Sequence, residues 1–165
     1  MLLSLPVTNI HQRELNASAS TAGDLIDRLA SERDELWPSD RWPPMRLDRP
    51  LGVGAVGGHG PIGYRVEDYE PGRNIRFRFT KPAEFLGTHR FEIDELSDEQ
   101  VILRHIIEMR VYGRTYLSWL FVIRPLHNAL IEDALDRAQR FVEGTPRHTR
   151  WSRWVRFLRW MVKKR

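Results

Sequence analysis

Residues 73–111 read RNIRFRFTKPAEFLGTHRFEIDELSDEQVILRHIIEMRV, and this stretch decides the fold. Within it, apolar and polar residues alternate in three runs, at 73–80, 85–96 and 101–111. Alternation with a period of two places one row of side chains in the core and the other in water. We predict three antiparallel strands, whose outward-facing charges of opposite sign could pair from strand to strand.

After residue 115 the period changes to 3.6. One set of residues recurs at steps of three or four, which is typical of one face of an α-helix. The set is Tyr116, Trp119, Leu120, Ile123, His127, Leu130, Ala134, Ala138 and Phe141. We predict a long helix that ends near Gly144. Pro125 should kink this helix or mark its start, in which case residues 116–123 form a last strand.

The region before residue 73 carries weaker signals. They predict a strand within 10–18, a helix over 22–30 behind the capping residues Ser20 and Thr21, a second short helix around 31–36, and strands at 45–48, 52–56 and 62–66. A glycine-rich turn is expected at 57–61. The fold class is therefore α+β: a curved antiparallel sheet of about seven strands, two short helices after the first strand, and a long C-terminal helix.

The composition is that of a globular chain, with 41% hydrophobic residues among 165. Cysteine is absent, which excludes disulfides, thiolate metal sites and a catalytic thiol. The longest apolar segment, 116–123, is too short to span a membrane, and the apolar start lacks the basic region of an export signal. We expect a cytoplasmic protein.

Charge is divided unevenly along the chain. Eight of the 26 Lys and Arg residues, and none of the 22 Asp and Glu residues, fall in 145–165. The formal net charge of +4 thus divides into +8 for this tail and −4 for the rest. Such asymmetry indicates an interaction tail. We predict a domain over 1–144 and a separate basic, Trp-rich tail over 145–165.

The order of elements resembles the START-like (SRPBCC) superfamily of polyketide cyclase, Bet v 1-type and lipid-transport proteins. The local residues that carry the resemblance are the Trp-Pro stretch at 37–44, Gly52-Val53-Gly54, the hairpin Tyr69-Glu70-Pro71-Gly72-Arg73 and the aromatic-rich last helix. It covers roughly residues 10–143. The resemblance implies a helix-grip fold and a deep cavity between sheet and last helix that holds an apolar or aromatic ligand. That superfamily contains both enzymes and binders, so it does not decide between them.

Several polar residues occur on faces expected to point inward. His89 and His105 lie on the apolar faces of their strands, His127 lies on the apolar face of the helix, and His59 lies in the glycine-rich turn at the expected rim. A neutral imidazole could orient a ligand by one hydrogen bond or act as a general base. It could equally be a structural histidine, satisfied by backbone or water. The predicted cavity residues are His59, Tyr64, Phe77, His89, Phe91, His105, Ile107, Trp119, Ile123 and His127.

Other chemistries are not indicated. The histidines lack metal-ligand spacing, so we predict no metal and no cofactor. The chain has neither a Gly-x-Ser-x-Gly elbow nor a phosphate-binding glycine motif. Glu132 and Asp133 should point away from His127, toward solvent or a loop that they cap, which speaks against a hydrolase.

The tail carries the second local signal. If 150–164 is helical, its apolar stripe is Trp151, Trp154, Val155, Leu158, Met161 and Val162, with arginines outside it and Trp160 off the stripe. This composition suits an anionic membrane surface at the inner face of the membrane, or a protein surface, including the body of the same chain. Nucleic acid is less favoured, because no reading fold accompanies the tail. The predicted contact residues are Trp151, Trp154, Arg156, Leu158, Arg159 and Met161.

Three functions stay open at this point. The first is a carrier or sensor of a hydrophobic small molecule, which could work at a membrane surface through its tail. The second is a cyclase or aromatase in which His89, His105 or His127 moves protons. The third is an interaction module whose tail binds a protein partner.

Overall fold

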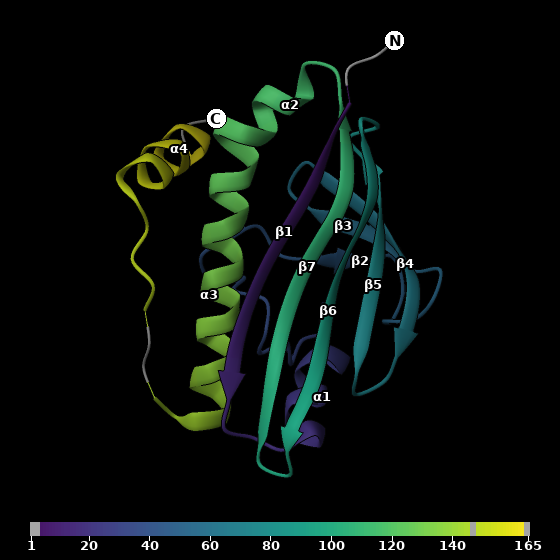
Figure 1. Cartoon of the computed structure of the whole chain (residues 1–165), viewed down its shortest axis with the longest axis vertical. Helices are drawn as coiled ribbons and strands as arrows, with labels where there is room; N and C mark the ends of the chain where they lie inside the picture. Colours follow the sequence, from purple (N-terminus) through teal and green to yellow (C-terminus); the bar gives the residue numbers. More distant parts are fainter. Residues whose placement is uncertain (1–3, 146–147, 164–165) are drawn as a thin grey trace.

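The computed structural model describes residues 4–145 and 148–163, and its centre is one antiparallel sheet of seven strands (Figure 1). The strand order is β1-β7-β6-β5-β4-β3-β2. The strands are β1 (Ser4–Leu15), β2 (Arg46–Leu47), β3 (Val56–His59), β4 (Ile62–Glu70), β5 (Asn74–Lys81), β6 (Phe85–Ser97) and β7 (Gln100–Tyr112). The α+β class and the count of about seven strands are confirmed.

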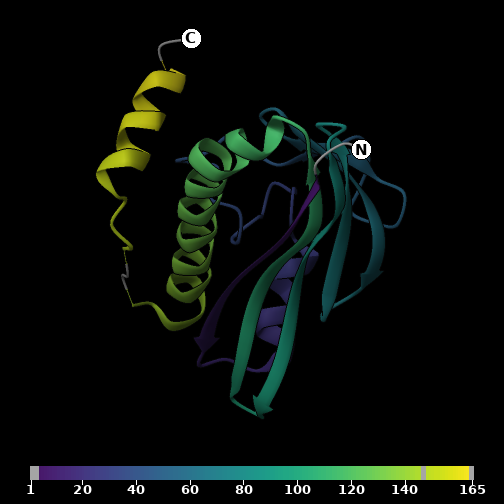
Figure 2. The same cartoon turned by 45° about the horizontal axis from the view of Figure 1, so that its top comes forward.

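The helices are α1 (Ala19–Asp27), α2 (Thr115–Ser118), the π-helical segment η1 (Trp119–Ile123), α3 (Arg124–Glu143) and α4 (Arg153–Lys163). The long helix contacts β1, and α4 lies beside it on the side opposite β1 (Figures 1 and 2). Within the described parts of the chain, no helix is long and apolar enough to cross a bilayer.

The inner face of the sheet forms the core, as the period of two predicts. On β7 the inward set Val101, Leu103, His105, Ile107, Met109 and Val111 is buried. Helix α1 covers one end of this face with Ala22, Leu25 and Ile26. On the outer face the predicted cross-strand pairs form: Arg90 lies 2.6 Å from Glu108, and Arg104 pairs with Asp94. Such exposed pairs contribute little, so the buried face sets the register.

Two predicted elements are wrong. The second short helix around 31–36 is absent, and residues 28–45 run as turns and bends. The strand expected at 52–56 lies instead at β3, where a glycine turn was expected. A Cβ on Gly57 would lie 1.9 Å from the carbonyl oxygen of Arg46, so only glycine lets β2 approach this closely. The first helix also begins earlier than expected, capped by Ser18.

Residues 116–123 are helical, which settles the alternative that Pro125 left open. The chain forms a π-helical segment just before this proline, a rare irregularity that interrupts the regular hydrogen bonding of an α-helix. In a regular α-helix the carbonyl of Phe121 would accept from residue 125, but proline has no N–H. The indole N–H of Trp154 in α4 donates to this carbonyl at 2.7 Å. The helix ends, as predicted, with Gly144 in the left-handed conformation.

Candidate ligand cavity

A cavity of about 260 Å³ lies between the sheet and the long helix. The strands β3, β5, β6 and β7 contribute one wall, η1 and α3 contribute the other, and residues of the 37–43 segment and of α4 also reach it. Seven of the ten predicted cavity residues belong to this lining: His59, His89, His105, Ile107, Trp119, Ile123 and His127. The first and the last of them are 68 positions apart along the chain, and the fold places all seven around one cavity.

The other three predicted cavity residues do not line it. Tyr64, Phe77 and Phe91 are fully buried in the core layer behind the lining. The ring of Phe77 stacks on His89 with centroids 4.9 Å apart, and Tyr64 meets the same imidazole edge-on at 4.8 Å. These aromatic rings fix the imidazole by packing, because stacked and edge-to-face rings resist reorientation. Strand parity selects the correct face of the sheet but does not separate lining from core.

The cavity has a polar pole made of imidazoles. His105 Nε2 and His89 Nδ1 lie 3.3 Å apart and share one hydrogen bond, and the ring of His127 lies 5.0 Å from that of His105. Burial keeps the pKa of His89 and of His105 well below the usual range, and it lowers the pKa of His127 to about 3. These rings are therefore neutral at pH 7.

Each of these three rings has one buried nitrogen without a hydrogen-bond partner among the described residues. The atoms are His89 Nε2, His105 Nδ1 and His127 Nδ1. Buried polar atoms of native proteins are nearly always paired, and an unpaired one costs about 1–3 kcal/mol. All three residues line the cavity, so a polar group in the cavity could satisfy them.

His59 lies at the end of β3, half-buried, and not in a turn. Its Nδ1 is 3.2 Å from the hydroxyl of Tyr64, and its ring lies 4.7 Å from that of Trp37. Burial lowers the pKa of His59 to about 4. The expectation that this residue flanks the cavity agrees with its place in the lining.

A second polar cluster, which sequence reasoning missed, lies outside the cavity lining. His11 Nδ1 is 2.6 Å from Glu132, and Arg13 binds both Glu132 and Asp136. The signal was present in β1, where His11 and Arg13 share the parity of the buried Leu15 and therefore face α3. This cluster ties β1 to the long helix.

Of the two alternatives expected for Asp133, exposure to solvent is wrong, and the side chain instead binds residues of two loop segments. It is buried, and its carboxylate accepts hydrogen bonds from the indole N–H groups of Trp42 at 2.7 Å and Trp151 at 3.0 Å. Arg41 forms an ion pair with its other oxygen at 2.8 Å. One carboxylate thereby joins α3, the 37–43 segment and the chain leading to α4. We refer to Asp133, Trp42, Trp151 and Arg41 as the Asp133 latch.

The tail is not detached from the body, and the single apolar stripe predicted for it is wrong. Val155 and Leu158, 5% and 2% exposed, pack inward, and Arg159 and Val162 reach the cavity. The helix that lies on the body was among the predicted alternatives. Met161 is exposed, and Arg156 faces an open groove described below.

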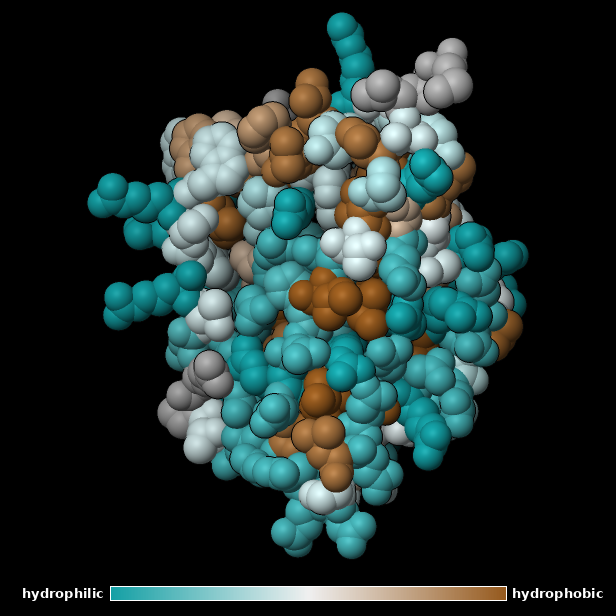
Figure 3. All heavy atoms as spheres, viewed as in Figure 1, coloured by the Kyte–Doolittle hydropathy of each residue, from teal (hydrophilic) through white to brown (hydrophobic). Residues whose placement is uncertain are grey.

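A second apolar set faces outward. The rings of Trp154, Phe157 and Trp160 follow one another along α4, with centroids 5.5 and 6.1 Å apart, and each is about half exposed. We call these three residues the aromatic ladder. Leu117 and Phe121 on the neighbouring helical segment are exposed as well. Figure 3 shows apolar side chains gathered at this end of the molecule, over α2 and α4.

Solved structures share this architecture. Norcoclaurine synthase from Thalictrum flavum, in complex with dopamine and hydroxybenzaldehyde, is 14% identical, with a TM-score of 0.62 over 87% of this chain and 91% of that one. CalU16 from Micromonospora echinospora is 14% identical, with a TM-score of 0.56 over 98% and 91%. A protein from Thermobifida fusca is 16% identical, with a TM-score of 0.63 over 87% and 99%.

The chain has the helix-grip fold of Bet v 1-like and START-like proteins. At these identities the likeness shows the fold and no particular activity. No protein-family model matches the sequence, and no curated protein matches it either.

Proposed function

We propose that this protein binds a hydrophobic small molecule in the cavity, with a polar group of that molecule directed at the imidazoles of His89, His105 and His127. The observation that carries the proposal is the set of three imidazole nitrogens that have no hydrogen-bond partner among the described residues, in a lining that is mostly apolar. Ligand sites of this kind combine apolar walls with a few placed polar groups. The small molecules named with norcoclaurine synthase, dopamine and hydroxybenzaldehyde, are aromatic and carry polar groups, which fits the same chemistry.

The volume of the cavity limits the size of the ligand. An engineered apolar cavity of about 150 Å³ holds benzene. A cavity of about 260 Å³ therefore suits a molecule of one or two rings, or a short chain, rather than a whole membrane lipid. Each unpaired nitrogen of these neutral imidazoles can either donate or accept one hydrogen bond. Phenols and carbonyl compounds are therefore the expected classes of ligand.

Filling the cavity should weaken binding of the ligand strongly. Ile123→Trp places a larger ring in the lining, and we expect it to weaken the binding of 2-naphthol at least tenfold, measured by isothermal titration calorimetry. The matched control is Ile10→Trp, the same exchange at a position that is 55% exposed and outside the lining. Equal affinity of both variants, each still folded by circular dichroism, would refute the cavity as the binding site.

Catalysis is the alternative that the paired imidazoles favour. A cyclase or aromatase would use the His89–His105 pair to move protons on the bound molecule. Native mass spectrometry separates the two functions by the mass of the molecule that copurifies with wild type and with His105→Gln. A carrier retains the same molecule in both, whereas an enzyme retains a different, unconverted molecule in the variant.

The aromatic ladder favours a second role at the inner face of a membrane. Exposed tryptophans beside arginines are typical of helices that lie at the level of lipid headgroups. Replacing Trp154, Phe157 and Trp160 together by alanine should reduce binding to vesicles of phosphatidylcholine and phosphatidylglycerol by more than tenfold in a sedimentation assay. Point variants are better than deletion of the tail, because Val155 and Leu158 belong to the core. If the triple variant binds vesicles as well as the wild type does, the membrane role of the aromatic ladder is wrong, and a protein partner is the remaining alternative.

A further inference from the structure

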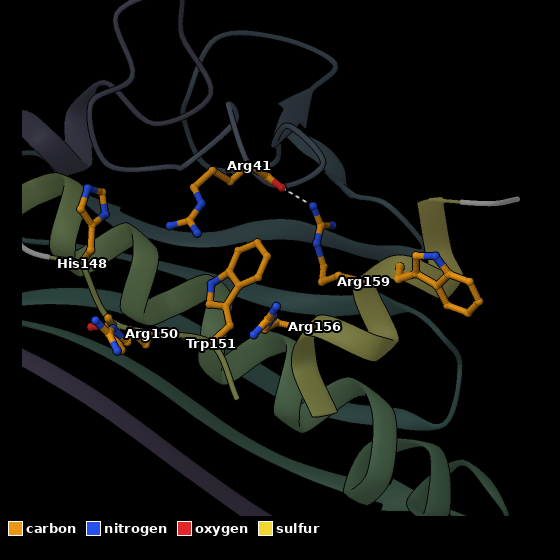
Figure 4. A pocket seen from close by; sticks show the side chains of 8 residues that line it. Arg41, His148, Arg150, Trp151, Arg156 and Arg159 are labelled. Atoms are coloured by element: carbon orange, nitrogen blue, oxygen red, sulfur yellow. Dashed lines mark hydrogen bonds between the residues drawn. The ribbon is translucent and has the colours of Figure 1, made fainter. Parts of the chain in front are cut away.

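An open groove of about 790 Å³ lies between α4, the segment leading into it and Arg41 (Figure 4). Its charged lining consists of Arg41, Arg150, Arg156 and Arg159 together with His148, and Trp151 and Trp160 supply its apolar surface. No carboxylate belongs to this lining. The sequence predicted a basic tail, and the fold places Arg150, Arg156 and Arg159 of this tail along one groove.

The positive charge of the groove is largely uncompensated. The charge of Arg41 is compensated by its ion pair with Asp133. Arg150, Arg156 and Arg159 form no ion pair with any carboxylate of the described residues. The groove thus presents about three positive charges on one side of the molecule.

Arg159 is fixed in place by its surroundings. Its guanidinium lies 4.4 Å from the ring centroid of Trp42, and it donates to the carbonyl oxygen of Arg41. Its Nε is buried and has no acceptor among the described residues. Burial and the neighbouring charge of Arg41 lower the pKa of Arg159, which means that the charged form is held at a cost. An anion in the groove would relieve that cost.

We propose that this groove is a binding site for a phosphate group, carried either by a small molecule or by a lipid headgroup. Three guanidinium groups without a carboxylate partner among the described residues match the double negative charge of a phosphate monoester better than the single charge of a carboxylate. The groove is larger than phosphate alone, so the group that carries the phosphate can pack on Trp151 and Trp160. This groove is a different site from the ligand cavity, and Arg159 is the one residue that lines both.

The test uses the full chain and inorganic phosphate, titrated by calorimetry at constant ionic strength against chloride. We expect binding that Arg156→Ala weakens about tenfold and that Arg150→Ala with Arg156→Ala abolishes, because each variant removes a guanidinium that can form a charge-assisted hydrogen bond with phosphate. Arg153→Ala is the matched control, since it removes the same charge from the same helix outside the groove. It should change the affinity less than twofold.

Vesicles distinguish the two sources of the phosphate. One set contains phosphatidic acid, which is a phosphate monoester, and the other contains phosphatidylglycerol at equal surface charge. Preference for phosphatidic acid that Arg156→Ala removes identifies a lipid headgroup, and binding of inorganic phosphate without that preference identifies a soluble ligand. Absence of phosphate binding in both assays, or equal losses in Arg153→Ala and Arg156→Ala, would overturn the proposal. Neither outcome depends on 2-naphthol binding in the cavity.

Discussion

Acidification from pH 7 to pH 4 is expected to unfold the protein, because four imidazoles are held uncharged inside it. The pKa of His59 is lowered to about 4 and that of His127 to about 3, and the pKa values of His89 and His105 lie well below the usual range. In the unfolded chain each would titrate near its ordinary value of about 6.5. Below that pH the four histidines therefore bind protons in the unfolded state but stay neutral in the folded state.

The sign and size of the effect follow from this difference. A histidine with a depressed pKa in the folded state contributes stability above pH 6.5 and loses it as the pH falls toward the folded value. Each fully affected group costs about 1.4 kcal/mol per pH unit. His59 and His127 are half-buried, so their share is smaller, and the four together should lower the free energy of unfolding by about 3–5 kcal/mol per unit. A domain of ordinary stability then unfolds between about pH 4 and pH 5.

Urea titrations at pH 7, 6, 5.5 and 5, followed by circular dichroism, measure this slope. His105→Gln should reduce it by about a third, because one of the two fully buried titrating groups is removed. His148→Gln, at an exposed position, should leave it unchanged. A free energy of unfolding that stays constant down to pH 5 would contradict the buried, neutral state of the imidazole cluster.

Removal of the Asp133 carboxylate should cause the second large effect. Asp133→Ala leaves the indole N–H groups of Trp42 and Trp151 without their acceptor and Arg41 without its partner. An indole N–H left unpaired costs about 1–3 kcal/mol, and loss of the ion pair adds less than a fully buried pair would because Arg41 is 36% exposed, so the total is about 3–5 kcal/mol. We expect a loss of stability of that size in urea denaturation. The segment before α4 should also become more sensitive to limited proteolysis, because Trp151 is one of its anchors.

Two further variants calibrate this result. Asp133→Asn retains one carbonyl acceptor and should lose about half as much. Asp24→Ala breaks the ion pair with Arg28, which is half exposed and one helical turn away, and should cost no more than about 1 kcal/mol. If Asp133→Ala is as stable as Asp24→Ala, the tail is not held by the latch.

The sequence predicted the elements that have a strong period. The long strands β5, β6 and β7 and the long helix bury one face each, so their side-chain spacing records the fold directly. The same parity placed His89 and His105 on the inner face, and the fold brings His127 to them.

Contacts between distant segments could not be predicted in this way. β3 is defined by backbone approach at Gly57, which leaves no apolar alternation. Asp133 looks like a surface residue by charge, and only the meeting of Trp42 with Trp151 makes it buried. In the tail, the helical period gives amphipathicity, but it does not say which of two apolar sets packs on the body. Leu158 packs inward, whereas the ring of Trp154 stays 46% exposed and its indole N–H donates to the carbonyl oxygen of Phe121.

The central claim is that the cavity holds an apolar molecule whose polar group meets the imidazoles. A crystal structure of the protein soaked with 2-naphthol tests it most directly. We predict density for the two rings between Ile107 and Ile123, with the hydroxyl about 3 Å from a nitrogen of His89, His105 or His127. A cavity that stays free of 2-naphthol at a concentration where calorimetry detects binding, with the ligand found elsewhere on the protein, would contradict the account.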